Sequence, residues 1–182
     1  MDFKIRFRPL QSDDARFINN LRNMESMERM LGGSMRPVAY ERDVKWVEDI
    51  ILGDSQSTIF FAITLAEADD IIGYTSISEI DYRNGTCFWS GIKIGEGHGG
   101  KGLGKQVTLK ILKYVFEELR MERCKAECLE EHETALKMML ATGYKQEGLM
   151  RKKVFKNGAH NNQWLLSVIR EDYAEIKKEF NL

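Results

Sequence analysis

The amino-acid sequence predicts an α+β protein, in which a mostly antiparallel, mixed sheet of six to seven strands is flanked by about four helices. Three observations lead to this fold class. Strand-like runs follow one another with short turns between them, helical patterns precede and follow these runs, and one glycine-rich stretch joins a strand to a helix. A doubly wound parallel sheet would alternate strands and helices regularly, and the observed order does not fit it.

The first quarter of the chain predicts one strand and two helices. Apolar and basic residues alternate over residues 3–8, which indicates a half-buried strand that Pro9 ends. Ser12 is a candidate N-cap for the first helix, because two aspartates follow it in the first turn and apolar residues then recur at helical spacing. The same spacing predicts a second helix over residues 40–52.

Three strand-like runs come next, over residues 58–65, 71–80 and 86–94, with turn-forming residues between them. This order predicts an antiparallel meander. Further along we expect a helix, a strand, a second helix and two hairpin-linked strands, at residues 101–119, 124–129, 132–142, 144–155 and 162–170. The charged tail after Glu171 predicts one more short helix.

The composition is that of a single domain over residues 1–182, without a linker or an internal repeat. The formal net charge of −1 argues against a nucleic-acid-binding role. No apolar run reaches the length of a membrane span, and the first residues lack the apolar core of a secretory signal. The three cysteines have no metal-type spacing and indicate reduced thiols, so we expect a cytoplasmic protein with no membrane partner.

The stretch GEGHGGKGLGKQ, which ends at Gln106, fits three glycine patterns. The G-x-G-x-x-G fingerprint for dinucleotides belongs to a repeating parallel sheet, which the predicted order of elements excludes. A P-loop requires Ser or Thr where Gln106 stands. The remaining interpretation is a glycine turn at a helix N-terminus, whose free N–H groups bind an anion such as a pyrophosphate. Lys101 and Lys105 can supply the counter-charge.

This stretch resembles the acetyl-CoA loop of the GCN5-related N-acetyltransferases, the GNAT superfamily, usually written Q/R-x-x-G-x-G/A. Gly102 and Gly104 match its two small positions, whereas Gly99 stands where Gln or Arg is usual. The chain is most similar to the RimJ/RimL-like branch, which includes ribosomal-protein, spermidine and aminosugar-nucleotide N-acetyltransferases. The resemblance spans nearly the whole chain.

A second signature, HETALKMMLATGY, resembles the N-x-x-A-x-x-L-Y-E-K-x-G-F segment that flanks the pantetheine arm of the cofactor in this family. Ala135, Gly143 and Tyr144 match that segment. His132 replaces the usual Asn, and Met139 replaces the Tyr that protonates the leaving thiolate in many members. A thioether carries no acidic hydrogen, so Met139 cannot take over this role.

The resemblance implies the GNAT fold and the transfer of an acetyl group from acetyl-CoA, as cosubstrate, to a primary amine by direct attack in a ternary complex. We expect acetyl-CoA and the amine acceptor as partners, no metal and no nucleic acid, and we allow for a homodimer. The cofactor-binding residues that the resemblance implies are Ile92, Lys93, Ile94, Gly99, Gly100, Lys101, Gly102, Leu103, Gly104, Lys105, His132, Ala135, Met138 and Met139.

Catalysis requires that the amine lose a proton, that an N–H group bind the oxyanion and that the thiolate be stabilised. For the oxyanion, the resemblance implies a strand bulge, which Gly91 permits. Glu79, with Asp81 on the same face by period two, is the candidate base acting through water, although solvated charges before a turn are an equally good interpretation. His98 is the other candidate. Tyr144, Ser90 or water can serve the thiolate.

Two other classes of function stay open. A non-catalytic acyl-CoA-binding or regulatory module would keep the fold without turnover, and Met139 and Gly99 both motivate this alternative. A nucleotide-triphosphate-dependent enzyme would need magnesium, against which Gln106 argues. Within the enzyme interpretation, the acceptor is a small amine such as a polyamine, an aminosugar or a protein N-terminus.

Overall fold

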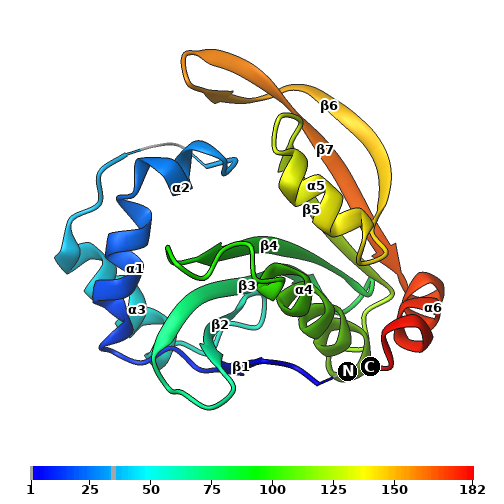
Figure 1. Ribbon diagram of the computed structural model, residues 1–182, viewed down its shortest axis with the longest axis horizontal. Coiled ribbons are helices and arrows are strands. Elements are labelled where there is room, and N and C mark those ends of the chain that lie inside the picture. The colour runs from blue at the N-terminus through cyan, green and yellow to red at the C-terminus, as the bar shows by residue number, and fades with distance from the viewer. Residues whose placement is uncertain (1, 34–35) are drawn as a thin grey trace.

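The structure, a computed structural model that describes residues 2–33 and 36–182, is built on a seven-stranded sheet (Figure 1). The strand order is β1-β2-β3-β4-β5-β7-β6, and all neighbours are antiparallel except β4 and β5, which are parallel. The strands are β1 (Ile5–Arg8), β2 (Ile59–Leu65), β3 (Ile71–Asp81), β4 (Thr86–Ile94), β5 (Arg123–Leu129), β6 (Lys145–Lys156) and β7 (Ala159–Ile169). The predicted fold class, a mostly antiparallel mixed sheet, is confirmed.

Six α-helices accompany the sheet in the described residues, where the sequence predicted about four. They are α1 (Asp14–Arg22), α2 (Glu25–Arg29), α3 (Tyr40–Leu52), α4 (Leu103–Lys113), α5 (Glu133–Leu140) and α6 (Arg170–Phe180). Helix α2 is short and buries no residue, so it carries no apolar periodicity that the sequence could reveal. Helix α4 continues as a π-helical segment, η1 (Tyr114–Glu118), which accounts for the longer helix predicted there.

Helices cover both faces of the sheet, as successive residues of β2 illustrate. Ile63 belongs to the apolar cluster that α4, α5 and α6 complete on one face. Ala62, its neighbour in the chain, belongs to the cluster formed with α1 and α3 on the other face. The side chains of a strand alternate between its faces, so a continuous apolar run such as β2 can serve two cores.

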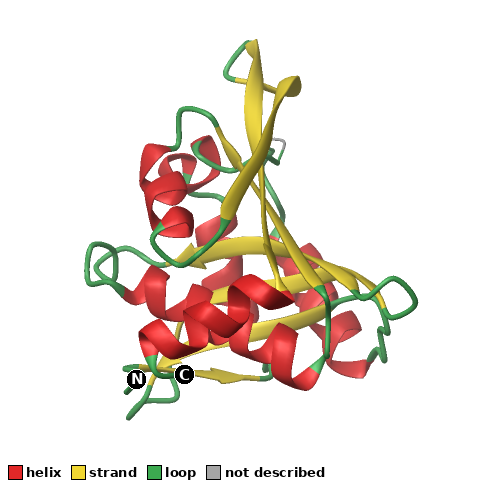
Figure 2. Cartoon of the chain, turned by 90° about the vertical axis from the view of Figure 1, so that its right-hand side faces the viewer, coloured by secondary structure: helices red, strands yellow, loops and turns green. Residues whose placement is uncertain are grey.

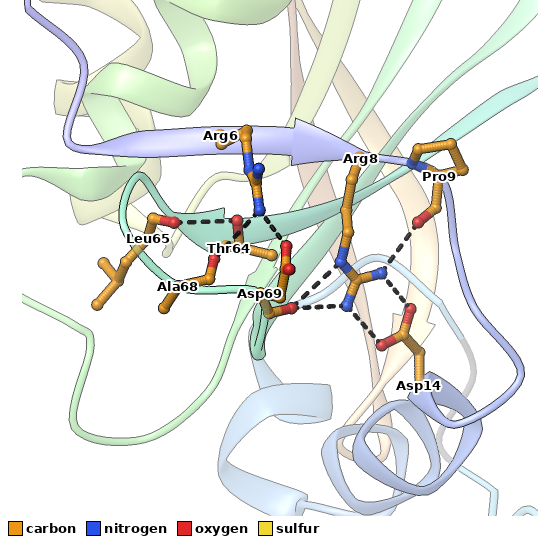
Figure 3. Close-up of polar contacts among 8 residues, drawn as sticks. All are labelled: Arg6, Arg8, Pro9, Asp14, Thr64, Leu65, Ala68 and Asp69. Atoms are coloured by element: carbon orange, nitrogen blue, oxygen red, sulfur yellow. Dashed lines mark hydrogen bonds and ion pairs between the residues drawn. The ribbon is translucent and has the colours of Figure 1, made fainter.

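Two arginines of the edge strand β1 bind it to its neighbours: Arg6 pairs with Asp69 of the β2–β3 loop, and Arg8 contacts both this loop and α1 (Figure 3). The Arg8 guanidinium donates to both carboxylate oxygens of Asp14, at 2.8 and 2.9 Å, and to the carbonyl of Asp69. Asp14 also accepts the backbone N–H of Gln11 at 2.8 Å. The prediction that Ser12 caps α1 is wrong, because Asp13 occupies the cap position and its side chain makes no capping bond.

The strands β4 and β5 pair over only three residues each, from Thr86 with Arg123 to Phe88 with Lys125. Beyond that point β4 stays paired with β3 and β5 with β7, so the two strands diverge toward their carboxyl ends. The β6–β7 hairpin extends past the rest of the sheet on the same side (Figure 2). Its two-residue turn, Asn157-Gly158, has positive φ at both positions, as a type I′ turn requires.

Candidate active site

A cavity of about 1200 Å³ opens where β4 and β5 diverge. Its walls come from the second half of β4, the glycine turn with the start of α4, helix α5, the end of β5, the segment 27–33 and part of the β6–β7 hairpin. Parts of the chain that are far apart in sequence therefore meet around one space.

The glycine turn forms the floor of the cavity at the N-terminus of α4. Gly100 and Gly102 have φ of 71° and 72°, a left-handed backbone that glycine adopts at little cost. Gly102 is the N-cap residue and offers no side chain, so the first N–H groups of α4 have no capping acceptor. Gly104 packs closely against α5, since a Cβ there would lie 2.8 Å from the Met138 sulfur and that side chain would have to shift. This turn can bind an anion at its free N–H groups.

The predicted bulge in β4 is confirmed. Two residues of β4, Ser90 and Gly91, stand opposite one residue of β3, and Gly91 has φ of 79°. The Thr75 hydroxyl fixes this geometry, because it donates to the Gly91 carbonyl at 2.7 Å and accepts from the Trp89 indole N–H at 2.9 Å. Both Ser90 and Gly91 line the cavity. A bulge of this kind turns backbone groups away from the sheet ladder.

Helix α5 forms the opposite wall and begins at His132. The His132 Nδ1 atom accepts the backbone N–H of Ala135 at 3.5 Å, so the imidazole caps the helix as the usual Asn would. Burial lowers the pKa of His132, which favours the neutral ring that this capping bond requires. Met138 and Met139 follow on the cavity wall.

Most of the predicted cofactor-binding residues come together in this cavity, with one exception. Lys101 is exposed and does not line it. The thirteen that do are Ile92, Lys93, Ile94, Gly99, Gly100, Gly102, Leu103, Gly104, Lys105, His132, Ala135, Met138 and Met139. Gln106, whose identity argued against a P-loop, accepts the backbone N–H of Lys4 at 2.8 Å and fixes the start of the chain.

Two of the three predicted catalytic residues lie away from the cavity. The Glu79 carboxylate accepts from the Lys125 ammonium at 3.1 Å on the exposed surface. Tyr144 is only 2% exposed, and its hydroxyl lies 3.3 Å from the Cys124 sulfur. Burial raises the pKa of Tyr144 well above its ordinary value, which makes its hydroxyl a poorer acid. This placement argues against both predicted roles, whereas Ser90 does line the cavity.

One charged group that lines the cavity, Glu127, and two charged contacts near it were not predicted. Glu127 of β5 lines it, and no other described residue bonds to its carboxylate. The Lys93 ammonium, expected only as a cofactor contact, pairs with the carboxylate of Glu28 at 2.6 Å. Lys156 donates to the carbonyls of Leu31 and Gly33 and so ties the β6–β7 hairpin to the segment beside α2. None of these contacts had a clear sequence signal, because Glu127 shares its strand with Arg123 and Lys125 and the other two contacts join distant segments.

Within the described residues, no group of three or more His, Cys, Asp or Glu side chains is placed to hold a metal ion. The helices in that part of the chain include none that is long and apolar enough to cross a membrane.

Comparison with known proteins places this fold and cavity in a family. The family model described as "Acetyltransferase (GNAT) domain" matches residues 4–145, and the chain therefore belongs to the GNAT acetyltransferases. An uncharacterized N-acetyltransferase, p20, of Bacillus licheniformis is 27% identical over 138 residues, which cover 75% of this chain and 76% of the relative. The SPbeta prophage-derived uncharacterized N-acetyltransferase YokL of Bacillus subtilis is 26% identical over 153 residues, or 84% and 80% of the two chains. The predicted enzyme class, an N-acetyltransferase, is thus confirmed.

Among solved structures, the spermidine N-acetyltransferase from Vibrio cholerae in complex with CoA and spermine has the same fold, with a TM-score of 0.85. It is 21% identical to this chain, and the match covers 94% of this chain and 98% of the other. A dodecameric structure of that spermidine N-acetyltransferase is similar as well, with a TM-score of 0.78 over 93% of this chain and 96% of the other.

Proposed function

We propose that this protein transfers an acetyl group from acetyl-CoA to a primary amine in a ternary complex. One observation carries the proposal: a single cavity joins an anion-binding glycine turn, a bulged strand and an unpaired carboxylate. These groups answer the needs of acetyl transfer, which are a seat for the pyrophosphate, a donor for the oxyanion and an acceptor for the amine proton.

The proposed acetyl-CoA site is based on the open space above the glycine turn. A Cβ at Gly100 or Gly102 would meet no protein atom within 4 Å, so nothing in the protein itself fills the space above the turn. Free N–H groups at the start of α4 would hold the pyrophosphate. Lys105 lines the cavity, but its ammonium lies 4.4 Å from the centroid of the Phe180 ring and would have to turn to reach a phosphate. Ala135 and Met138 form an apolar wall that would suit the pantetheine arm, and the bulge at Gly91 lines the same cavity.

Glu127 replaces Glu79 as the proposed base. It stands on β5, across the divergence from the bulge in β4, and it is half-buried without a bonding partner. A carboxylate that is already paired is a poor proton acceptor, whereas an unpaired one can take a proton directly or through one water. His98 also lines the cavity, but it belongs to the glycine turn beside the proposed pyrophosphate seat.

For the leaving thiolate, Ser90 and water remain. The Ser90 hydroxyl lines the cavity and lies 3.0 Å from the hydroxyl of Ser78, with which it can exchange a proton. Met139 also lines the cavity, but its thioether cannot donate. Of Ser90 and Met139, Ser90 at the bulge is therefore the better proton donor.

The runner-up is a non-catalytic acyl-CoA-binding or regulatory module, which would use the same glycine turn without turnover. A homodimer stays a prediction, and so do the acceptor classes named above. Spermine, found with the Vibrio cholerae enzyme, belongs on any list of acceptors to be tested.

The test compares two glutamates in a CoA thiol-release assay with acetyl-CoA and a panel of amines. We expect Glu127→Gln to lower kcat by about 100-fold or more, as the loss of a general base does. Glu79→Gln is the matched control: it removes an exposed ion pair, which is worth about 0–1 kcal/mol, and should leave kcat unchanged. Equal effects of the two variants would refute the assignment of Glu127. Acetyl-CoA binding without turnover on any amine would favour the binding module.

A further inference from the structure

One part of the cavity, here called the acceptor end, is lined by two lysines and two glutamates, which are not equally free to bind an acceptor. The acceptor end consists of the segment 27–33, Lys93, Glu127 and the hairpin residues 153–155. Its charged side chains decide which amines can bind there, because an amine arrives as an ammonium ion at neutral pH and its other groups must find partners.

One of the two carboxylates at the acceptor end is already neutralised. Glu28 pairs with Lys93 at 2.6 Å, and both side chains are largely buried, at 14% and 21% exposed. Lys156 lies behind this pair, is only 4% exposed, and interacts electrostatically with both of its members. The Lys156 ammonium donates to backbone carbonyls and does not line the cavity, but its charge lies near the pair, so the cluster Glu28–Lys93–Lys156 has a net positive charge.

A third ammonium group has no partner at all. Lys153 lines the cavity from β6, and none of the other described residues forms a hydrogen bond or an ion pair with it. On the acidic side only Glu127 is free, and the proposed mechanism uses it for the reacting amine. A second ammonium group on an acceptor would therefore find no free carboxylate, but the unpaired ammonium group of Lys153 and a glutamate already paired with Lys93.

From this arrangement we infer that the acceptor is a small amine that also carries an anionic group, a carboxylate or a phosphate, rather than a polyamine. The anionic group would lie toward Lys153 and the Glu28–Lys93–Lys156 cluster, while the amine faces Glu127. This inference rests on the proposed function, because it assigns the acceptor of the same cavity.

The experiment measures binding rather than turnover, so that its failure is distinct from a failure of acetyl transfer. In the CoA-saturated protein, the dissociation constants of matched probes are compared by calorimetry: O-phosphoethanolamine with ethanolamine, β-alanine with β-alaninamide, and spermidine alone. We expect the anionic member of at least one pair to bind about tenfold tighter or more than its neutral partner, and tighter than spermidine. The pair with the larger ratio distinguishes phosphate from carboxylate.

Two variants locate the effect. Lys153→Met should reduce the preference for the anionic probe to about threefold or less, since it removes the unpaired ammonium group. Lys152→Met is the matched control: its side chain is exposed next door but does not line the cavity, and the preference should persist. Equal binding within each pair, tighter binding of spermidine, or no binding of any anionic probe would each overturn the inference. Whether any of these probes is acetylated is a separate measurement, which tests only the proposed function.

Discussion

Replacing Gly102 with alanine tests whether the left-handed backbone at the start of α4 is what fixes the glycine turn. The φ of Gly102 is 72°, and a Cβ added there meets no atom within 4 Å, so the cost is conformational and not steric. A left-handed conformation costs a non-glycine residue about 1–2 kcal/mol. In a chain of this size, the melting temperature should fall by roughly 2–8 °C.

Gly99→Ala is the matched control for that variant. A Cβ at Gly99 also meets nothing within 4 Å, but its φ is not positive, so alanine should be neutral or should stabilise the protein by about 0.4–1 kcal/mol. Urea denaturation of the two variants, together with titration by acetyl-CoA, measures both effects. We expect weaker acetyl-CoA binding only for Gly102→Ala. Equal loss of stability, or equal loss of affinity, in both variants would refute this reasoning.

Three further substitutions test other parts of the account. The Asp43 carboxylate is 0% exposed and pairs with Arg22 at 2.7 Å. Arg22→Met removes this cation and should lower the free energy of unfolding, measured by urea denaturation, by about 3 kcal/mol. An unchanged midpoint would contradict that estimate. Burial lowers the pKa of His132 from its ordinary value of 6.5. The stability that depends on the neutral imidazole is therefore fully present above pH 6.5 and is lost as the pH falls through the pKa of the folded state. His132→Asn should keep the helix cap and remove this acid-side loss, which unfolding curves between about pH 5 and 8 can check. Tyr144→Phe should cost about 0.5–1.5 kcal/mol of stability and leave kcat unchanged, and a large drop in kcat would restore Tyr144 as a catalytic candidate.

The sequence was sufficient for the elements whose signals are local. Strand-like runs bounded by turn residues located β2, β3 and β4 to within a residue or two. Helix α3 matches the predicted range, because its buried residues recur at helical spacing. The glycine turn was recognisable for the same reason, since left-handed backbone at Gly100 and Gly102 is a property of a few consecutive residues.

The candidate site was harder to predict because its geometry depends on contacts between distant segments. Glu79 was placed by simple alternation, but a register shift between Ser78 and Asp81 and a positive φ at Glu79 itself break that alternation. Glu127 faces the cavity only because β4 and β5 diverge, which no local pattern encodes. The pairing of Lys93 with Glu28 joins residues 65 positions apart.

The central claim, acetyl transfer to an amine from acetyl-CoA seated on the glycine turn, is tested most directly by acceptor-dependent release of free CoA. The assay uses acetyl-CoA with amino acids, phosphorylated amines, aminosugar nucleotides, polyamines and peptides, for the wild type and for Gly102→Glu. The variant places a negative charge where the pyrophosphate would lie. We predict turnover with one acceptor class that the variant abolishes. Failure of the wild-type protein to bind acetyl-CoA, or binding and turnover that the variant leaves intact, would contradict the claim.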